Sequence, residues 1–340
     1  MRRPDGPGRD SAGMGRREFL RLSACGLTVI GLPVGCLRED EGTPAADHLA
    51  SGRPVSPQFS DARTPVLWVE AGTCTGCACS LLGSRLPPVE VLLPDVRLEF
   101  QETLMERFGA PAVDHLLSLA GAAAGRFVLV VDGAIPVGAG ASLTTLGVDG
   151  RGRDYTAAEL VTQLADRAAR VVALGTCAAF GGIPSSGAGA GMYVSVAEAT
   201  GRMPLRVPGC PPNPQWISAA LGALLRGEAL ELDELGRPMA FFSSTVHELC
   251  PRLGSFRNRD FATAPGDAVR CLRQVGCKGQ LARGDCPIRL WQGRSSCVKA
   301  GSPCVACTAP GFPDARPTVD GRAVGEEGKA ASPFLRPLPL

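Results

Sequence analysis

The placement of cysteine is the feature that most constrains the fold of this 340-residue chain. Four short apolar runs are rich in β-branched residues, and cysteines stand at or just after the ends of three of them. The runs are "VLWVEAG" (66–72), "RFVLVVDGAI" (126–135), "RVVALGTC" (170–177) and "PLRVPGC" (204–210). Helical patterns lie between or after these runs, at 156–169 and 214–225. This alternation predicts an α/β fold with a parallel sheet that helices cover on both faces.

Four of the cysteines are expected to meet at one edge of that sheet. In open α/β sheets, ligands bind beyond the carboxyl ends of the strands. The thiols that follow strand ends are Cys74, Cys77, Cys177 and Cys210. Four thiolates are the ligand set of a [4Fe–4S] cluster and also of structural zinc. Zinc sites more often use two close pairs on small hairpins, so thiols from three separate strand ends favour a cluster.

The pattern changes after Gly227, where strand signals fade and short helical pieces alternate with Gly, Pro and Cys. A smaller, mostly irregular domain is therefore expected to follow the α/β domain. The predicted parts are a signal segment (1–40), a linker (41–64), an α/β domain (65–227) and a metal-cluster domain (228–340).

The second domain contains eight further candidate ligands, enough for two four-ligand sites: His247, Cys250, Cys271, Cys277, Cys286, Cys297, Cys304 and Cys307. His247 and Cys250 are three residues apart, so a helical turn would place them on one face. Ligand binding would also supply folding free energy to a region with little regular structure. A disulfide framework is the alternative for an exported chain. Three four-ligand metal sites explain the cysteines better than disulfides do, because such sites leave only Cys25, Cys36 and Cys79 unassigned.

The first forty residues indicate export. Arg16 and Arg17 form a twin-arginine pair before Phe19 and a short apolar stretch, the pattern of a twin-arginine signal. Proteins that use this route fold, and often take up cofactors, before crossing the membrane. Cys36 follows small residues, as in a lipoprotein cleavage site. The alternative to an ordinary signal is therefore one that is cleaved before a lipid-anchored Cys36. We expect a periplasmic protein, and the formal net charge of +2 gives no reason to expect a nucleic-acid partner.

The motifs together resemble one known family. They are "CTGCxxSLL", "GTCAxxGGIP", "VPGCPPNP", "VHxxCPR", "CLxxxGCKG", "DCPxRxW", "AGxPCxxC" and "PGFPD". From the export signal to about Pro313, the chain resembles the small, electron-transferring subunit of [NiFe] hydrogenases. The resemblance implies a flavodoxin-like first domain. It also implies an oxidoreductase acting on H2, in which a Ni–Fe centre in a large partner subunit splits hydrogen and this chain carries no H2-activating site.

The resemblance further implies three iron–sulfur clusters in series. A proximal [4Fe–4S] cluster would use Cys74, Cys77, Cys177 and Cys210, and a distal one His247, Cys250, Cys271 and Cys277. The medial cluster would use Cys286, Cys304 and Cys307. Many exported relatives have Pro at the position of Cys297, which leaves a [3Fe–4S] cluster. The cysteine here predicts a fourth thiolate and a [4Fe–4S] medial cluster.

Other departures from the family concern the oxygen tolerance of the enzyme and the identity of its electron acceptor. Cys79 stands where many relatives have Glu and is expected to be an unligated thiol. Oxygen-tolerant members carry extra cysteines at the positions of Gly76 and Gly182, so the glycines predict an oxygen-sensitive enzyme. The membrane-anchoring tail helix of some relatives is absent, and a soluble multihaem c-type cytochrome is the expected acceptor.

Three other functions remain open at this point. The small subunit of a hydrogen-sensing complex would have the same clusters but no export signal. A cluster subunit of a respiratory complex would share only the thiols of the first domain. A zinc- or disulfide-stabilised binding protein would need none of the family motifs.

Overall fold

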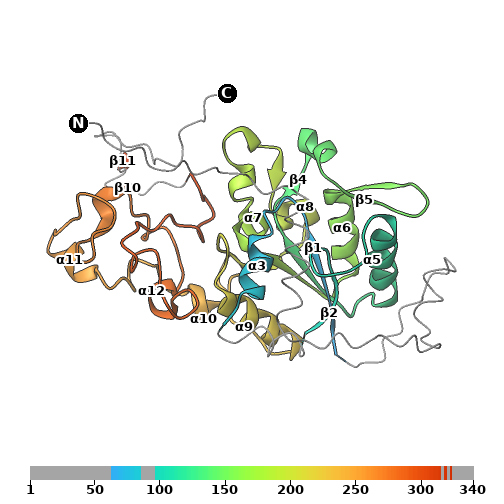
Figure 1. Cartoon of the computed structure of the whole chain (residues 1–340), viewed down its shortest axis with the longest axis horizontal. Helices are drawn as coiled ribbons and strands as arrows, with labels where there is room; N and C mark the ends of the chain where they lie inside the picture. The colour runs from blue at the N-terminus through green and yellow to red at the C-terminus, as the bar shows by residue number, and fades with distance from the viewer. Residues whose placement is uncertain (1–62, 86–95, 315–317, 320–321, 324–340) are drawn as a thin grey trace, which may run out of the picture. The chain divides into compact units, whose positions relative to one another are not determined.

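The computed structural model describes residues 63–85, 96–314, 318–319 and 322–323 (Figure 1). The predicted signal segment, with Cys25 and Cys36, and the linker up to residue 62 lie outside the described residues. All the described residues belong to one compact unit, and the predicted boundary between residues 227 and 228 stays a prediction. None of the helices in the described part of the chain is long and apolar enough to cross a membrane.

Five parallel strands form the central sheet, in the order β2-β1-β3-β7-β9. They are β1 (Pro65–Glu70), β2 (Arg97–Gln101), β3 (Val128–Asp132), β7 (Arg170–Leu174) and β9 (Leu205–Val207). Numbered within the sheet, this is the 2-1-3-4-5 order of the flavodoxin-like fold. The predicted fold is thus confirmed. The edge strand β2 was not predicted, because its sequence, RLEFQ, contains only two apolar residues.

Alternate side chains of each strand pack on opposite faces of the sheet. Leu67 and Val69 of β1 join one apolar cluster, whereas Val66 and Trp68 join the other. Helices α5 (Ala110–Ala122), α6 (Ala157–Arg167) and α8 (Val196–Thr200) cover the first face. Helices α3 (Gly76–Leu82), α9 (Pro214–Leu225) and α10 (Met239–Phe242) cover the second (Figure 1). The double cover explains why the central strands are continuous apolar runs.

The two helices predicted from the sequence are α6 and α9, and each begins at a capping side chain. The Thr156 hydroxyl accepts from the Glu159 amide, and the Asn213 side chain accepts from the Gln215 amide. Such caps satisfy amides that the first helical turn leaves without a partner.

The remaining elements are short. Two antiparallel pairs lie beside the main sheet: β4 (Ile135–Pro136) with β8 (Tyr193–Val194), and β5 (Thr145–Val148) with β6 (Asp154–Thr156). A third pair joins β10 (Thr318–Val319) to β11 (Arg322–Ala323). The other short helices are α7 (Gly175–Phe180), α11 (Leu253–Arg257), α12 (Cys286–Arg289), η2 (Gly138–Leu143), η3 (Ile183–Ser185), η4 (Gly187–Gly189) and η5 (Leu272–Val275).

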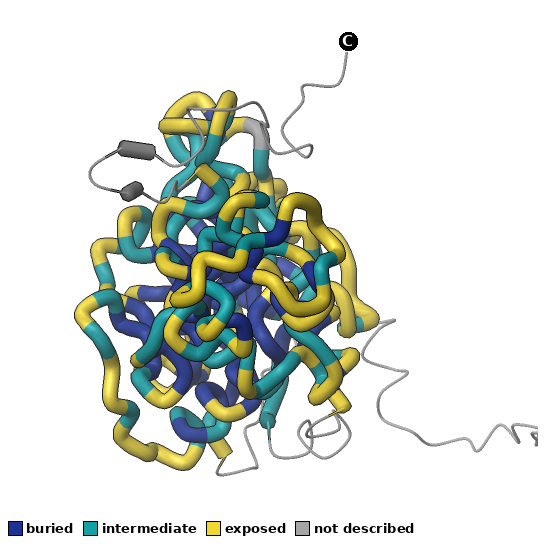
Figure 2. The backbone as a smooth tube through the Cα atoms, turned by 90° about the vertical axis from the view of Figure 1, so that its left-hand side faces the viewer, coloured by how far each residue is buried: buried dark blue, intermediate teal, exposed yellow. Residues whose placement is uncertain are grey.

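The region from residue 228 to 314 consists mainly of turns and loops around a small apolar cluster. Its buried members include Val246, Val298 and Cys304, and the half-buried thiols Cys250 and Cys277 pack against them. Figure 2 turns this side of the molecule toward the viewer, where intermediate and exposed backbone predominates. Cysteines are therefore a substantial part of the core of this region, together with Val and Ala side chains.

A buried arginine holds several of these loops together. The Arg252 guanidinium donates to the carbonyl oxygens of Asp267, Arg270 and Val298, each at 2.7 Å. Only 5% of Arg252 is exposed. Hydrogen bonds to a charged donor in such a site stabilise more than neutral ones.

Candidate metal-cluster sites

The first ligand set lies at the carboxyl edge of the sheet. Cys74 and Cys77 follow β1, Cys177 lies in α7 directly after β7, and Cys210 follows β9. The pKa of each of the other three thiols is raised by Cys74 among other causes, so the four side chains converge. This edge is where the strand order reverses between β1 and β3, the usual ligand position in this fold.

Burial is the main reason that Cys77, Cys177 and Cys210 resist ionisation. It raises the pKa of Cys77, with smaller contributions from Asp132, Cys177 and Cys74. It also raises the pKa of Cys177 to about 11, with Cys210 as the next cause. Because metals bind thiolates, cluster assembly here would release protons.

Two glycines of the "GTC" and "GGIP" motifs allow the thiols to approach. Gly175 has φ +81°, and a Cβ there would lie 2.5 Å from Cys77 Sγ. Gly182 has φ +55°, and a Cβ there would lie 2.9 Å from the backbone nitrogen of Cys177. Side chains at either position would be strained and would collide with a ligand segment.

Asp132 belongs to this site and was not found from the sequence. It ends β3, is 1% exposed, and accepts a hydrogen bond of 3.0 Å from the Thr73 hydroxyl. Burial raises the pKa of its carboxyl to about 6, although the Cys77 thiol and the Thr73 hydroxyl favour the ionised form. The sequence feature that could have identified Asp132 is the acidic residue at the end of an otherwise apolar strand.

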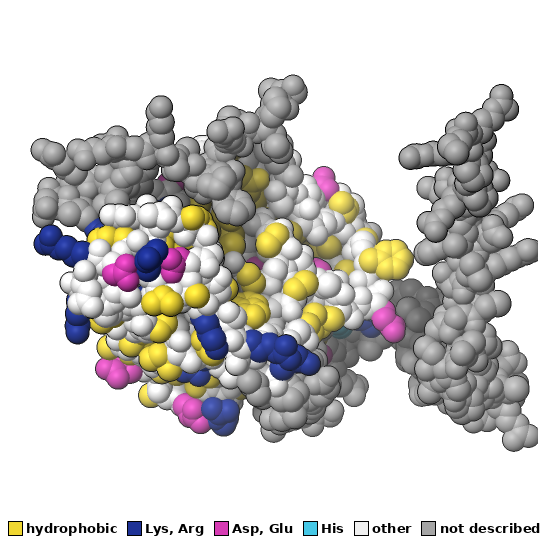
Figure 3. Space-filling view, turned by 60° about the vertical axis from the view of Figure 1, so that its left-hand side comes forward, with side chains coloured by type: hydrophobic (Ala, Val, Ile, Leu, Met, Phe, Trp, Pro, Cys, Tyr) yellow, Lys and Arg dark blue, Asp and Glu magenta, His cyan; other side chains and the backbone are white. Residues whose placement is uncertain are grey.

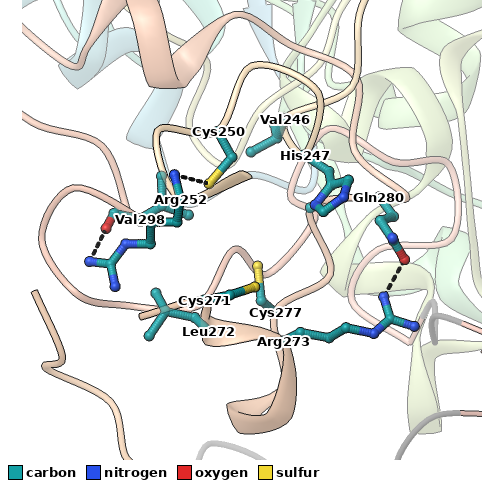
Figure 4. A pocket seen from close by; sticks show the side chains of 11 residues that line it. Val246, His247, Cys250, Arg252, Cys271, Leu272, Arg273, Cys277, Gln280 and Val298 are labelled. Atoms are coloured by element: carbon teal, nitrogen blue, oxygen red, sulfur yellow. Dashed lines mark hydrogen bonds between the residues drawn. The ribbon is translucent and has the colours of Figure 1, made fainter. Parts of the chain in front are cut away.

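The second ligand set lines one pocket in the loop region. His247, Cys250, Cys271 and Cys277 surround it, with Arg252 and Arg273 also in its wall. Figure 4 shows the imidazole and the three sulfur atoms facing a common space. His247 and Cys250 belong to a turn closed by a 3.1 Å hydrogen bond from the Cys250 amide to the His247 carbonyl. The spacing of three residues thus brings the two side chains together.

The third ligand set is Cys286, Cys297, Cys304 and Cys307. Burial raises the pKa of Cys286 to about 12, and Cys307 and Cys297 also raise it. Burial likewise raises the pKa of Cys304, with Cys307 and Cys286 among the further causes. Cys286, Cys304 and Cys307 therefore influence one another, and Cys297 raises the pKa of Cys286 and Cys307, whereas its own pKa is raised by burial and by Cys277 of the second set.

Cys79 differs from the twelve candidate ligands. It is exposed on α3, and it is not among the causes that shift the pKa of the thiols in the first set. The structure thus gives no indication that Cys79 belongs to the first ligand set.

Contacts connect the third set to the other two. The backbone of Cys210 lowers the pKa of the Cys307 thiol against the larger effect of burial, which indicates that the two residues are neighbours. On the other side, the Cys304 amide lies 3.4 Å from Cys277 Sγ and donates to it. The third set therefore lies between the first and the second.

Thr176 strengthens the connection between the first and third sets. Its hydroxyl donates to the carbonyl of Cys307 and accepts from the Gly209 amide at 2.8 Å. Its own amide donates to the Gly209 carbonyl at 2.9 Å. One residue that is 1% exposed thereby joins the segments that carry Cys177, Cys210 and Cys307.

Thiols dominate the three donor sets. The twelve described cysteines are free thiols. Within the described residues, no group of three or more His, Cys, Asp or Glu side chains is placed to hold one metal ion. The ligands of a [4Fe–4S] cluster bind its irons individually, so they need not crowd around a single centre.

Two family models match the chain. "NADH ubiquinone oxidoreductase, 20 Kd subunit" matches residues 74–224, which hold the first ligand set. The model of the C-terminal part of the NiFe/NiFeSe hydrogenase small subunit matches residues 242–319, which hold the second and third sets.

Curated relatives match over nearly their whole length. The periplasmic [NiFeSe] hydrogenase small subunit of Desulfomicrobium baculatum is 34% identical over 324 residues, covering 89% of this chain and 97% of the relative. The periplasmic [NiFe] hydrogenase small subunit of Solidesulfovibrio fructosivorans is 30% identical, with coverage of 91% and 96%.

Solved structures agree with these relatives. A chain of the reduced, active Ni-Fe-Se hydrogenase from Desulfomicrobium baculatum has a TM-score of 0.70 and 35% identity, covering 74% of this chain and 96% of that chain. A chain of the actinobacterial-type NiFe-hydrogenase from Ralstonia eutropha H16 has a TM-score of 0.68 and 31% identity, with coverage of 75% and 81%.

Proposed function

The chain belongs to the family of [NiFe] and [NiFeSe] hydrogenase small subunits, and from this premise we propose that it is the electron-transferring partner of a periplasmic large subunit. Bound iron–sulfur clusters would supply one-electron transfer between the large subunit's Ni–Fe site, where H2 is oxidised or formed, and an external acceptor. A soluble multihaem c-type cytochrome is the acceptor class that we expect. Export by the twin-arginine signal around Arg16 and Arg17 fits the periplasmic relatives.

The observation that carries the proposal is the arrangement of three four-ligand sets in series. We assign the proximal cluster to Cys74, Cys77, Cys177 and Cys210, the medial cluster to Cys286, Cys297, Cys304 and Cys307, and the distal cluster to His247, Cys250, Cys271 and Cys277. The support is the convergence within the sets, the contact of the Cys304 amide with Cys277 Sγ, and the hydrogen bond from Thr176 to the Cys307 carbonyl.

The surrounding backbone fits sulfur ligands. The Arg252 amide donates to Cys250 Sγ and the Ala306 amide to Cys304 Sγ, both at 3.4 Å. Such donors stabilise negative charge on ligand sulfurs, and they tune cluster potentials. The residues of the loop region would thus both hold the clusters and set their potentials.

A respiratory-complex subunit is the second candidate, because one family model names such a protein. That match ends at residue 224, before the first ligand of the other two sets. The hydrogenase relatives span both regions. The ligands beyond residue 242 therefore favour the hydrogenase function.

The test counts metal in the anaerobically purified complex with its large subunit. Iron and acid-labile sulfide are measured per small subunit, after subtraction of the one active-site iron that the family implies. Three [4Fe–4S] clusters predict about twelve irons. A value near four would contradict the assignment of both sets in the loop region, and zinc in place of iron would contradict the whole proposal.

Cys297 is tested in the same complex. We expect Cys297→Ser to lower the count to about eleven and to produce the EPR signal of an oxidised three-iron cluster. Cys79→Ser is the matched control and should leave both the iron content and the EPR spectrum unchanged. A wild-type count near eleven with that EPR signal would show that Cys297 is not a ligand.

A further inference from the structure

The chain segment that forms most of the His247 pocket carries an excess of positive charge. Residues 242–283 contain seven Arg and Lys residues and three Asp and Glu residues, whereas the whole chain has a formal net charge of only +2. The basic residues are Arg252, Arg257, Arg259, Arg270, Arg273, Lys278 and Arg283, and the acidic ones are Glu248, Asp260 and Asp267. Positive charge is thus concentrated in the segment that holds the distal set.

Several of these arginines are not neutralised by carboxylates in the described part of the chain. Arg257 and Arg259 are exposed and make no ion pair with a described residue. The Arg273 guanidinium bonds the Gln280 amide oxygen, which leaves its charge uncompensated. Arg270, by contrast, pairs with Asp260 at 3.2 Å and with Asp267 at 3.8 Å.

Direct contacts connect this charge to the pocket. The His247 ring lies edge-on to Phe256, with 4.5 Å between the ring centroids, and the Arg273 guanidinium lies 5.8 Å from the Phe256 centroid. Arg257 follows Phe256 directly in α11, and the Arg259 amide donates to the Phe256 carbonyl at 3.1 Å. Arg273 therefore lies beside the aromatic ring that contacts His247, and Arg257 and Arg259 belong to the same backbone segment as Phe256.

The same face offers an apolar contact. Val269 is 69% exposed, and the Ser255 hydroxyl of α11 donates to its carbonyl at 3.2 Å. Figure 3 brings this side of the molecule forward and shows Lys and Arg side chains, with some Asp and Glu side chains beside them, set among apolar ones. We define the distal face as His247, Arg257, Arg259, Val269 and Arg273. Charged groups around a small apolar contact suit a transient protein–protein interface.

We propose that the distal face docks an electron carrier whose own surface is acidic around its redox centre. The inference rests on the proposed function, since it places the acceptor over the distal set. An acidic partner would be attracted by Arg257, Arg259 and Arg273, whereas a lysine-rich partner would be repelled. Among c-type cytochromes, the expected acceptor is therefore one with an acidic face around its exposed haem.

The test uses the holo complex with its large subunit and two probes of opposite charge. The probes are an acidic [2Fe–2S] ferredoxin and a lysine-rich c-type cytochrome. We expect H2-driven reduction of the ferredoxin to slow steeply as salt rises from about 20 to about 300 mM, because screening weakens steering. Reduction of the cytochrome should be slow at low salt and should not decrease as salt is added.

Charge reversal then locates the docking site. Arg257→Glu with Arg259→Glu should lower the second-order rate constant for ferredoxin reduction about tenfold at low salt, with a flatter salt dependence. Arg167→Glu with Arg170→Glu changes the net charge equally, at the opposite edge of the sheet, and should have little effect. The dissociation constant of oxidised ferredoxin for the immobilised complex should change in parallel, without any turnover.

Exchange between H2 and D2O separates the two proposals, because it needs the Ni–Fe site but no acceptor. Loss of exchange in the wild type would count against the hydrogenase function itself. With exchange intact, faster reduction of the lysine-rich cytochrome at low salt would overturn the acidic-partner proposal. Arg257- and Arg259-dependent binding to anionic lipid vesicles, without any effect on ferredoxin, would overturn it as well.

Discussion

The sheet region (residues 65–227) and the loop region (residues 228–314) hold their ligands in different ways. In the sheet region, a five-stranded sheet covered on both faces positions Cys74, Cys77, Cys177 and Cys210 at strand ends. In the loop region, the ligands Cys250, Cys277, Cys286 and Cys304 belong to the small apolar cluster themselves. In the sheet region, the fold positions the ligands. In the loop region, the ligands are themselves part of the apolar core.

The difference shows what a metal cluster contributes to each region. Apolar burial supplies the sheet region with a driving force that is independent of metal. The loop region buries far fewer apolar side chains than the sheet region, so we expect ligand binding to supply much of its stability. Removal of metal should therefore affect the two regions unequally.

The largest expected effect follows from removal of the clusters. We expect anaerobic oxidation and chelation to increase amide exchange across residues 242–314 by at least about a hundredfold, while β1, β3 and β7 remain protected. Hydrogen exchange with mass spectrometry measures both regions in one sample. Equal loss of protection in the sheet and the loops would break the comparison.

A smaller effect is expected from one glycine in the sheet region. Gly182→Ala would place a Cβ 2.9 Å from the Cys177 backbone, at φ +55°, and should lower the iron content by about four per chain. Gly187→Ala is the matched control, because Gly187 has φ +53° but no atom within 4 Å of its added Cβ. Equal iron loss in the two variants would point to backbone strain instead of ligand crowding.

The connection between the regions should depend on the Thr176 hydroxyl. Thr176→Val keeps the shape but leaves the Gly209 amide and the Cys307 carbonyl without this partner, a cost of about 1–3 kcal/mol. Peptides that contain Cys307 should exchange faster, and the midpoint potential of the third set in EPR titration should change. Thr176→Ser retains the hydroxyl and should preserve both values. An unchanged potential in Thr176→Val would limit this residue to a structural role.

The smallest effect concerns the pH dependence of the sheet region. Burial raises the pKa of Glu102 to about 8, and the Glu70 carboxylate contributes in the same direction. Since the folded pKa is above the ordinary glutamate value of 4.5, the stabilisation is complete below about pH 4.5 and is lost as the pH rises through about 8.

The Glu102→Gln variant should therefore gain Tm relative to the wild type between about pH 5 and pH 8, by a few degrees. The exposed Glu106→Gln serves as the control. Parallel curves of Tm against pH for wild type and Glu102→Gln would show that the Glu102 carboxyl does not ionise with an altered pKa.

Strand-end cysteines could be found from the sequence because the signal is local. An apolar run followed by Cys74 or Cys177 predicts both a strand and a ligand at its end, and the sheet confirms the strands. The polar edge strand β2 has no such run and was not predicted. Asp132 was also overlooked, because its role depends on its contact with Cys77 across the sheet edge.

In the loop region, the sequence supplied ligand types and spacing but not their neighbours. The His247–Cys250 spacing was sufficient to pair those two side chains in a turn. The contact between the Cys304 amide and Cys277 Sγ joins residues 27 positions apart, and no periodic pattern predicts such a contact.

The sequence by itself determined the α/β fold, the family and the twelve candidate ligands, because strand periodicity and cysteine spacing are properties of neighbouring residues. Only the tertiary structure decided that Thr176 joins three ligand segments, that the Cys304 amide contacts Cys277 Sγ, and that Arg273 lies beside the Phe256 ring that contacts His247. Those features arise where distant loops meet in space, and side-chain packing and hydrogen bonds, not chain order, determine which loops meet.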